Sequence, residues 1–222
     1  MANSKVIIVE GPQGVGKTTI TDFIRNSISY TNLYRLCGTH DVTKSGRVKS
    51  IKMYRALMNY IEEMQNTNVN LLFDRTFFTE EIYCRLGKKD YTFTDIYEKL
   101  LSRLANLDFD IYYITLYLEN ENEYCKRLDR PEKAKMAKAD FEASSSIIQQ
   151  REYLKMADEV KEKYKNINVI NINNSRPLEE VKKQIKELLD WKHWLDYKYF
   201  NNLLNFLMNL QLQNKVWKEG HN

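Results

Sequence analysis

The opening residues of the chain contain the pattern that most constrains its fold. A short apolar run, Val6-Ile7-Ile8-Val9, leads through a glycine-rich segment at residues 11–18 into a stretch with helical spacing, Lys17–Ser27. A β-branched run without polar alternation suits a strand buried on both faces, as strands in parallel sheets are. A strand, a tight turn and a helix in this order predict an α/β protein.

The same alternation continues along the chain and predicts one sheet with helices on both faces, because crossovers between parallel strands are short and right-handed. No internal repeat interrupts it. Further strands are expected at Leu33–Cys37 (the weakest), Asn70–Phe73, Ile111–Leu118 and Ile167–Ile172. Helices are expected at Lys17–Ser27, Val48–Met64, Tyr97–Leu104, Glu121–Leu128, Phe141–Tyr164 and Leu178–Leu189.

Composition excludes several classes of protein. Of 222 residues, 29% are charged and 43% hydrophobic, which is typical of a globular domain and not of disordered or fibrous chains. The net charge of +4 suits an anionic ligand without requiring one. Cys37, Cys84 and Cys125 lie far apart, which favours neither a disulfide framework nor a zinc site. An N-terminus that enters its first strand by Val6, and the lack of a long apolar run, lead us to expect a cytoplasmic protein without a membrane partner.

The glycine-rich segment fits the P-loop pattern G-x-x-x-x-G-K-[ST] at every fixed position, between a buried strand and a helix. Its backbone N–H groups and the start of the helix converge on phosphate oxygens, so ATP with Mg²⁺ is the expected ligand. Lys17 would neutralise the β- and γ-phosphates, and the Thr18 hydroxyl would contact Mg²⁺. The expected nucleotide-binding residues here are Gly11, Gly14, Val15, Gly16, Lys17, Thr18 and Thr19.

Asp74 and Arg75 follow the apolar run Asn70–Phe73. The carboxyl ends of strands in an open α/β sheet face the ligand crevice. A carboxylate there can hold Mg²⁺ or accept a proton, and a guanidinium can bind phosphate. We therefore expect both residues to be catalytic, Asp74 also to contact the metal, and Arg75 also to contact the substrate.

A third set of cations, Arg127, Arg130 and Lys133, lies on and after the helix that follows the fourth strand. Cations on a mobile segment there could close over ATP and stabilise the transferring phosphoryl group. We expect Arg127 to bind the nucleotide and Arg130 to be catalytic, in a lid at about residues 127–140.

These motifs, together with Asn174-Ser175-Arg176-Pro177 after the last strand, resemble the thymidylate kinase and deoxynucleoside kinase superfamily over residues 5 to 189. The resemblance implies a three-layer P-loop fold with a five-stranded parallel sheet, a lid and a nucleoside pocket beyond the third strand. It implies that Arg176 and Pro177 border adenine. It also implies that Arg55 contacts the acceptor base.

The sequence departs from this family in ways that bear on the acceptor. Thymidylate kinases usually carry an Arg-Glu-Pro-Gly element after the second strand, where this chain reads Leu36-Cys37-Gly38-Thr39. The stretch from Thr76 to Tyr83 instead resembles deoxynucleoside kinases and related phage enzymes. Its aromatic residues are candidates for stacking on a base, although such residues are more often core: Phe77, Phe78 and Tyr83.

After residue 190, apolar residues recur at intervals of three and four, from Leu195 to Leu210. This pattern predicts an amphipathic helical extension at 191–222, following a kinase domain at 1–190. The extension either packs on the domain or forms a surface for a second copy or another partner.

The leading hypothesis is an ATP- and Mg²⁺-dependent kinase of a pyrimidine deoxynucleoside monophosphate or deoxynucleoside. One alternative keeps the fold but transfers phosphate to a hydroxyl within DNA or RNA, which the positive charge permits. A second alternative is a nucleotide-dependent switch or assembly ATPase, against which the Asp74–Arg75 pair argues, since a switch needs no acceptor contact.

Overall fold

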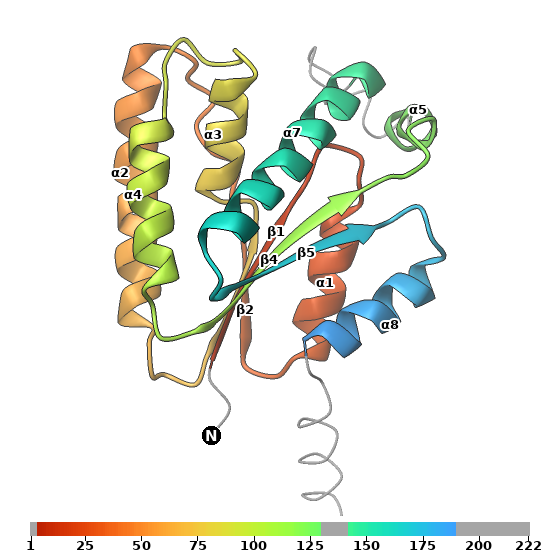
Figure 1. Cartoon of the computed structure of the whole chain (residues 1–222), viewed down its shortest axis with the longest axis horizontal. Helices are drawn as coiled ribbons and strands as arrows, with labels where there is room; N and C mark the ends of the chain where they lie inside the picture. Colours follow the sequence, from red (N-terminus) through yellow and green to blue (C-terminus); the bar gives the residue numbers. More distant parts are fainter. Residues whose placement is uncertain (1–3, 130–141, 190–222) are drawn as a thin grey trace, which may run out of the picture. The chain divides into compact units, whose positions relative to one another are not determined.

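The computed structural model describes residues 4–129 and 142–189, and they alternate strands with helices (Figure 1). The chain divides into two compact units, Met1–Leu178 and Glu179–Asn222. The strands are β1 (Lys5–Glu10), β2 (Thr31–Arg35), β3 (Asn70–Asp74), β4 (Asp110–Tyr117) and β5 (Ile167–Asn173). The helices are α1 (Lys17–Ser27), α2 (Lys44–Glu63), α3 (Phe77–Arg85), α4 (Thr94–Ala105), α5 (Glu123–Leu128), α7 (Ala143–Lys163) and α8 (Leu178–Leu188).

The five strands form one parallel sheet in the order β2-β3-β1-β4-β5, which confirms the predicted fold class. The central strand β1 pairs with β3 on one side and with β4 on the other. All carboxyl ends therefore meet at one edge of the sheet. The P-loop and the Asp74–Arg75 pair leave neighbouring strands at that edge.

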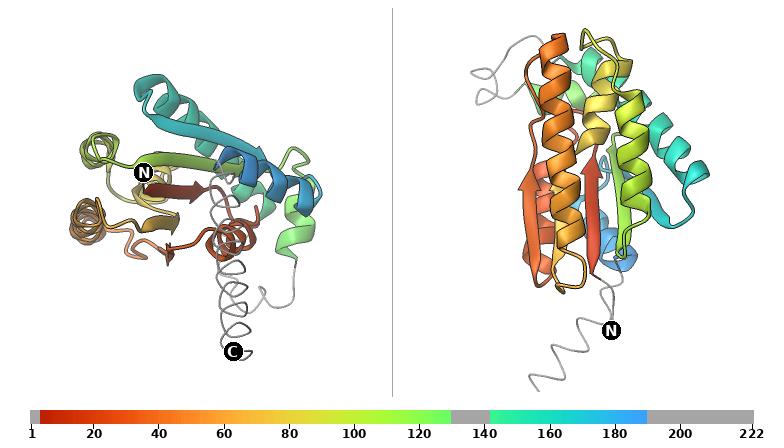
Figure 2. Two further views of the ribbon diagram at one scale, coloured as in Figure 1. Left: turned by 90° about the horizontal axis from the view of Figure 1, so that it is seen from below. Right: turned by 90° about the vertical axis from the view of Figure 1, so that its left-hand side faces the viewer.

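Alternate residues of each strand face opposite sides of the sheet and build two apolar layers. Val6 and Ile8 of β1 join a core that also holds Phe73 of β3 and Tyr113 of β4. The helices α2, α3, α4 and α7 contribute to this core, and Figure 1 and Figure 2 show them on one face with α1 on the other. Both faces of β1 are buried, as the uninterrupted apolar run predicts.

The expected helices are present, and most of their bounds differ from the prediction by a few residues. Helix α2 begins at Lys44, four residues earlier than predicted, because the Thr43 hydroxyl accepts a hydrogen bond from the Ser45 amide at 3.2 Å. The Asp41 carboxylate accepts from the Thr43 amide at 3.0 Å and fixes the turn before the helix.

Helix α3 was not predicted. Its residues from Phe77 to Ile82 are all buried, including three polar ones, so apolar and polar residues do not alternate with the three-to-four residue spacing of a surface helix. The helix instead packs within the core, where it contacts α4 and α7.

Two sequence predictions fall on residues outside the described ranges: the lid beyond Asp129 up to residue 140, and the C-terminal extension at 191–222. Within the described ranges, no helix combines the length and apolar character that crossing a bilayer requires.

We expect the aromatic side chains of α3 to contribute strongly to the free energy of unfolding. Phe78 is fully buried, with its ring 4.4 Å from that of Tyr113 and 4.6 Å from that of Phe77, measured between centroids. Replacing it by alanine should lower the free energy of unfolding by about 3–5 kcal/mol, because the cavity cannot close fully. Denaturant unfolding measures this, with Ile148→Ala on α7 as the control, since Ile148 is 53% exposed and its loss should cost less than about 0.5 kcal/mol. Equal losses in the two variants would contradict this account of the core.

Candidate functional site

The P-loop adopts a conformation that its glycines make accessible. Gly11, Gly14 and Gly16 all have positive φ, at 143°, 78° and 97°. A Cβ on Gly11 would come within 2.7 Å of the Leu116 carbonyl oxygen, so a side chain there would displace the backbone of β4. The tight path brings the loop back to the start of α1 and leaves its first-turn amides without partners inside the helix.

Lys17 lies over this loop rather than in solvent. Its side chain is buried, and its ammonium group donates hydrogen bonds to the carbonyl oxygens of Gly11 at 2.8 Å and Pro12 at 2.7 Å. The ammonium charge is thereby held within the curve of the loop. Thr18 and Thr19, in the first turn of α1, are exposed.

The second part of the site stands at the end of β3. Asp74 is opposite Val9 of β1 in the sheet register and is 7% exposed. Arg75 has φ of 71°, a left-handed conformation that is uncommon for arginine, and its amide donates to the Val9 carbonyl at 3.1 Å. The carboxylate and the guanidinium therefore leave the strand through a sharply turned backbone beside the P-loop.

Glu10, the last residue of β1, fixes that turn and was not among the predicted site residues. Its fully buried carboxylate accepts hydrogen bonds from the Thr76 amide at 2.7 Å, the Thr76 hydroxyl at 3.1 Å and the Thr79 hydroxyl at 2.6 Å. Burial raises the pKa of Glu10 from 4.5 to about 7, although these donors and the charges of Arg75 and Lys17 oppose the rise. The signal in the sequence is a carboxylate that ends an otherwise apolar strand immediately before the first glycine.

The surroundings of Arg75 favour its charged form. Burial alone would lower the pKa of Arg75, but interactions with Tyr153, Tyr83, Glu10 and Asp74 outweigh it and the pKa is raised. Arg75 thus keeps its charge while largely withdrawn from water, where a cation attracts an anionic group more strongly than it does on an exposed surface.

Arg35, the last residue of β2, was also missed because its strand has the weakest pattern. Its Nε lies 3.8 Å from an Asp74 carboxylate oxygen, and its Nη2 forms an ion pair with Asp22. Nearly half of the Arg35 side chain is exposed. It is therefore an accessible cation next to the predicted catalytic pair.

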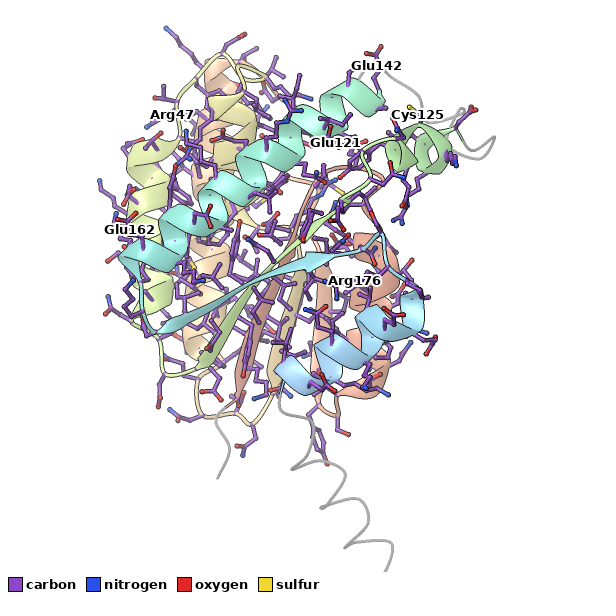
Figure 3. The ribbon with its side chains drawn as sticks, turned by 45° about the vertical axis from the view of Figure 1, so that its right-hand side comes forward. Arg47, Glu121, Cys125, Glu142, Glu162 and Arg176 are labelled. Atoms are coloured by element: carbon purple, nitrogen blue, oxygen red, sulfur yellow. The ribbon has the colours of Figure 1, made fainter. Side chains whose placement is uncertain are left out.

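A single cavity of about 830 Å³ connects the P-loop, the Asp74–Arg75 pair and Arg35. The P-loop and α1 line one part of it, and the ends of β2 and β3 line another. A third part comes from α5 and the segment after β5, where Figure 3 labels Arg176. The lining residues are Gln13, Gly14, Gly16, Lys17, Thr18, Thr19, Arg35, Leu36, Cys37, Asp74, Arg75, Arg127, Asn174, Arg176 and Leu178.

Arg127 is held against the P-loop by several polar contacts. Its guanidinium donates to the carbonyl oxygens of Val15 at 3.4 Å and Asn174 at 2.8 Å, and it pairs with Glu123 at 2.7 Å. The predicted location of Arg127 beside the phosphate-binding segment agrees with this geometry. Arg130, the predicted catalytic lid residue, lies outside the described ranges.

The remaining predicted substrate residues do not line this cavity. Phe77 and Phe78 are 1% and 0% exposed, and each packs against other core rings, so a base could not stack on either without opening the core. Tyr83 is half-buried, with the Lys88 ammonium 5.5 Å from its ring centroid. Arg55 is exposed on α2. Pro177, which was predicted to border the adenine, is exposed and also lies outside the cavity lining.

The fold has clear structural neighbours. A thymidylate kinase from Candida albicans superposes with a TM-score of 0.61 at 15% identity, covering 87% of this chain and 94% of the neighbour. The YorR protein of Bacillus subtilis, solved in complex with phosphorylated GDP, gives 0.57 at 18% identity, covering 85% and 97%. A deoxyadenosine kinase from M. mycoides, with dCMP and dCDP as products, gives 0.54 at 16% identity, covering 84% and 98%.

This chain has the P-loop kinase fold. At 15–18% identity the likeness establishes architecture and leaves the substrate open. No protein-family model matches the sequence, and no curated protein matches it.

The raised pKa of Glu10 predicts a specific pH dependence of stability. The folded chain keeps this proton up to about pH 7, whereas an unfolded chain releases it near 4.5. Between these values the folded state binds more protons, so the Glu10 contribution makes the free energy of unfolding fall as the pH rises. The non-titrating variant Glu10→Gln should lose this contribution.

Denaturant unfolding at intervals from pH 4.5 to 8 measures the effect as the difference between the wild-type and Glu10→Gln curves. Glu162→Gln, an exposed position on α7, is the matched control and should follow the wild type. A constant offset between the wild-type and Glu10→Gln curves across this range would contradict the assignment.

Proposed function

We propose that this chain is an ATP- and Mg²⁺-dependent phosphotransferase that acts on a pyrimidine deoxynucleoside monophosphate or deoxynucleoside. The observation that carries the proposal is that one cavity is lined both by a P-loop with its lysine and by Asp74 and Arg75. A donor polyphosphate and an acceptor can therefore meet in one space, as phosphoryl transfer requires.

On the donor side, the P-loop amides and the Lys17 ammonium would bind the β- and γ-phosphates. Lys17 now donates to two carbonyl oxygens of its own loop, and phosphate oxygens would take their place. Arg127 would contact the donor phosphates, Arg176 and Pro177 would border the adenine, and Arg130 would act from the lid.

The residues at this edge also fit a magnesium ion. The Thr18 hydroxyl and the Asp74 carboxylate line the same cavity, and oxygen donors are the ligands that Mg²⁺ prefers. When bound, Mg²⁺ would supply positive charge to the β- and γ-phosphates.

On the acceptor side, Arg35 and Arg75 place two guanidinium groups beside Asp74 on the cavity wall. Two cations there favour an acceptor that carries its own phosphate over a free nucleoside, because a guanidinium binds phosphate with paired donors. Tyr83 interacts with Arg75 and would lie near the acceptor. Arg55 would contact the base only if the acceptor reaches α2.

The choice of a pyrimidine rests on the sequence resemblance. A thymidylate kinase and a deoxyadenosine kinase with dCMP and dCDP bound share the fold, which is consistent with a pyrimidine deoxynucleotide. The YorR protein was solved with phosphorylated GDP, so any test of the acceptor must include purine nucleosides and nucleotides.

The chemical step follows from this arrangement. An acceptor oxygen forms a bond to the γ-phosphorus as the bond from that phosphorus to the β–γ bridging oxygen breaks, which leaves ADP. Lys17 offsets the charge that develops on the leaving group, and Arg75 holds the acceptor in line. When the acceptor is a nucleoside hydroxyl, Asp74 would accept its proton, because this carboxylate lines the cavity whereas Glu10 is fully buried.

Replacing Lys17 by alanine should lower kcat/KM for phosphoryl transfer by at least about 100-fold, since a charge aimed at the transition state is lost. Transfer of the labelled γ-phosphate of ATP to acceptors measures this. Lys155→Ala, at an exposed position on α7, is the control and should retain wild-type activity. A Lys17→Ala enzyme with near wild-type turnover would rule out the proposed chemistry.

A substrate screen tests the acceptor. Labelled ATP with Mg²⁺ is offered to the common deoxynucleosides, their monophosphates and short oligonucleotides, and we expect the phosphorylated product from a pyrimidine monophosphate. Product only from oligonucleotides would replace the proposal by a polynucleotide kinase, and hydrolysis of ATP without transfer would replace it by a switch ATPase.

Arg35→Gln should raise the KM for the monophosphate by roughly 10- to 100-fold and leave the KM for ATP unchanged, because a charged hydrogen bond to the acceptor phosphate is lost. Steady-state kinetics with each substrate varied in turn separates the two constants. Arg151→Gln, at an exposed position on α7, serves as the control. Unchanged KM for the monophosphate would remove Arg35 from the acceptor site.

A further inference from the structure

The carbonyl group of Val15, within the P-loop, is held from outside the loop. The Asn174 side-chain amide donates to this oxygen at 2.6 Å, and Arg127 donates to it at 3.4 Å. Asn174 is 7% exposed and directly follows β5. Its side chain therefore links the end of β5 to the P-loop, which follows β1.

Asn174 is itself fixed by its neighbours. Its backbone amide donates to the Tyr117 carbonyl of β4 at 2.8 Å, and its backbone carbonyl accepts from Arg127 at 2.8 Å. Its side chain also packs directly against the loop, because a Cβ on Gly16 would come within 2.5 Å of the side-chain nitrogen Nδ2 of Asn174. A rigidly placed donor thus faces one peptide group of the P-loop.

The direction of that peptide group determines where a neighbouring donor points. The described backbone contains no cis peptide bond, and in a trans peptide the C=O and the following N–H point in opposite directions. With the Val15 carbonyl turned toward Asn174, the amide of Gly16 is turned away from it. Rotation of this peptide changes ψ of Val15 and φ of Gly16. Gly16 has φ of 97° and, as a glycine, little intrinsic preference for that angle, so a side-chain contact can determine the direction of the peptide.

We propose that Asn174 is a positioning residue for polyphosphate binding: by holding the Val15 carbonyl, it keeps the Gly16 amide directed toward the bound phosphates. The inference rests on the proposed function, because it assumes that the P-loop amides bind a nucleoside triphosphate. It assigns to the segment after β5 a role in the phosphate site, in addition to the adenine border expected there.

Asn168, which lies on β5, provides a matched control six residues before Asn174. Its side-chain amide also donates to a backbone carbonyl, that of Ile111, at 3.1 Å. That carbonyl belongs to β4 within the sheet, and Asn168 does not line the cavity. Removing its side chain deletes a comparable hydrogen bond without touching the P-loop.

The test compares Asn174→Ala with Asn168→Ala by isothermal titration with Mg²⁺-ATP, with Mg²⁺-tripolyphosphate and with adenosine. Tripolyphosphate has no base and adenosine has no phosphate, so together they separate the two parts of the nucleotide. Asn174→Ala should weaken binding of ATP and of tripolyphosphate by about 5- to 10-fold, the value of one net hydrogen bond. Adenosine binding and the KM for the acceptor should not change, and Asn168→Ala should bind all three ligands as the wild type does.

A second variant guards against a change in folding or packing. Asn174→Leu keeps the bulk of the side chain but has no donor, and it should weaken tripolyphosphate binding to a similar extent. Thermal unfolding without nucleotide is followed for every variant. If Asn174→Ala does not fold, Asn174→Leu alone decides the question.

The outcomes separate this inference from the proposed function. If the wild type binds tripolyphosphate and both Asn174 variants bind it equally well, the positioning role is wrong and the kinase proposal stands. If adenosine binding falls as much as tripolyphosphate binding, Asn174 acts on the base and the inference is also overturned. If the wild type binds neither ATP nor tripolyphosphate, the proposed function itself fails.

Discussion

The pairing of β1 with β3 is the constraint on which the site depends. Parallel hydrogen bonding in register brings Val9 opposite Asp74, so the P-loop and the Asp74–Arg75 turn leave the sheet as neighbours. Because β1 lies in the middle of the sheet with apolar side chains on both faces, its direction and its end point are determined by the whole core. The P-loop therefore begins at the end of a strand that the core holds in place.

Two polar contacts extend this order into the turns. The buried carboxylate of Glu10 accepts from Thr76 and so holds the turn after β3, in which Arg75 takes a left-handed conformation. On the opposite side of the P-loop, Asn174 and Arg127 donate to the Val15 carbonyl. Both contacts join segments that are distant in sequence.

Much of the fold could be predicted because apolar runs and helical spacing are local signals. The strands and the P-loop followed from such patterns, and the parallel sheet has the predicted five strands. Helix α3 was not predicted because burial on all its faces removes the amphipathic pattern. The same burial accounts for Phe77 and Phe78, whose aromatic side chains suggested a base-binding site but fill the core.

The candidate site was only partly predictable for a related reason. Lys17, Thr18, Asp74, Arg75 and Arg127 were found through motifs or through their positions after strands, and all five line one cavity. Glu10, Arg35 and Asn174 were not predicted as site residues, since their roles come from contacts between segments that are distant in sequence. A single sequence reports such contacts weakly.

The cavity draws its walls from different stretches of chain. The part proposed to bind a triphosphate comes from the P-loop, α1, α5 and the segment after β5, whereas the part proposed to bind an acceptor comes from the ends of β2 and β3. The segment from Arg35 to Thr43 lies at the edge of the sheet and leads directly into α2. On the proposed function, exchanging this short connection would alter the choice of acceptor and leave the P-loop part of the cavity unchanged, so donor use and acceptor range could be engineered independently.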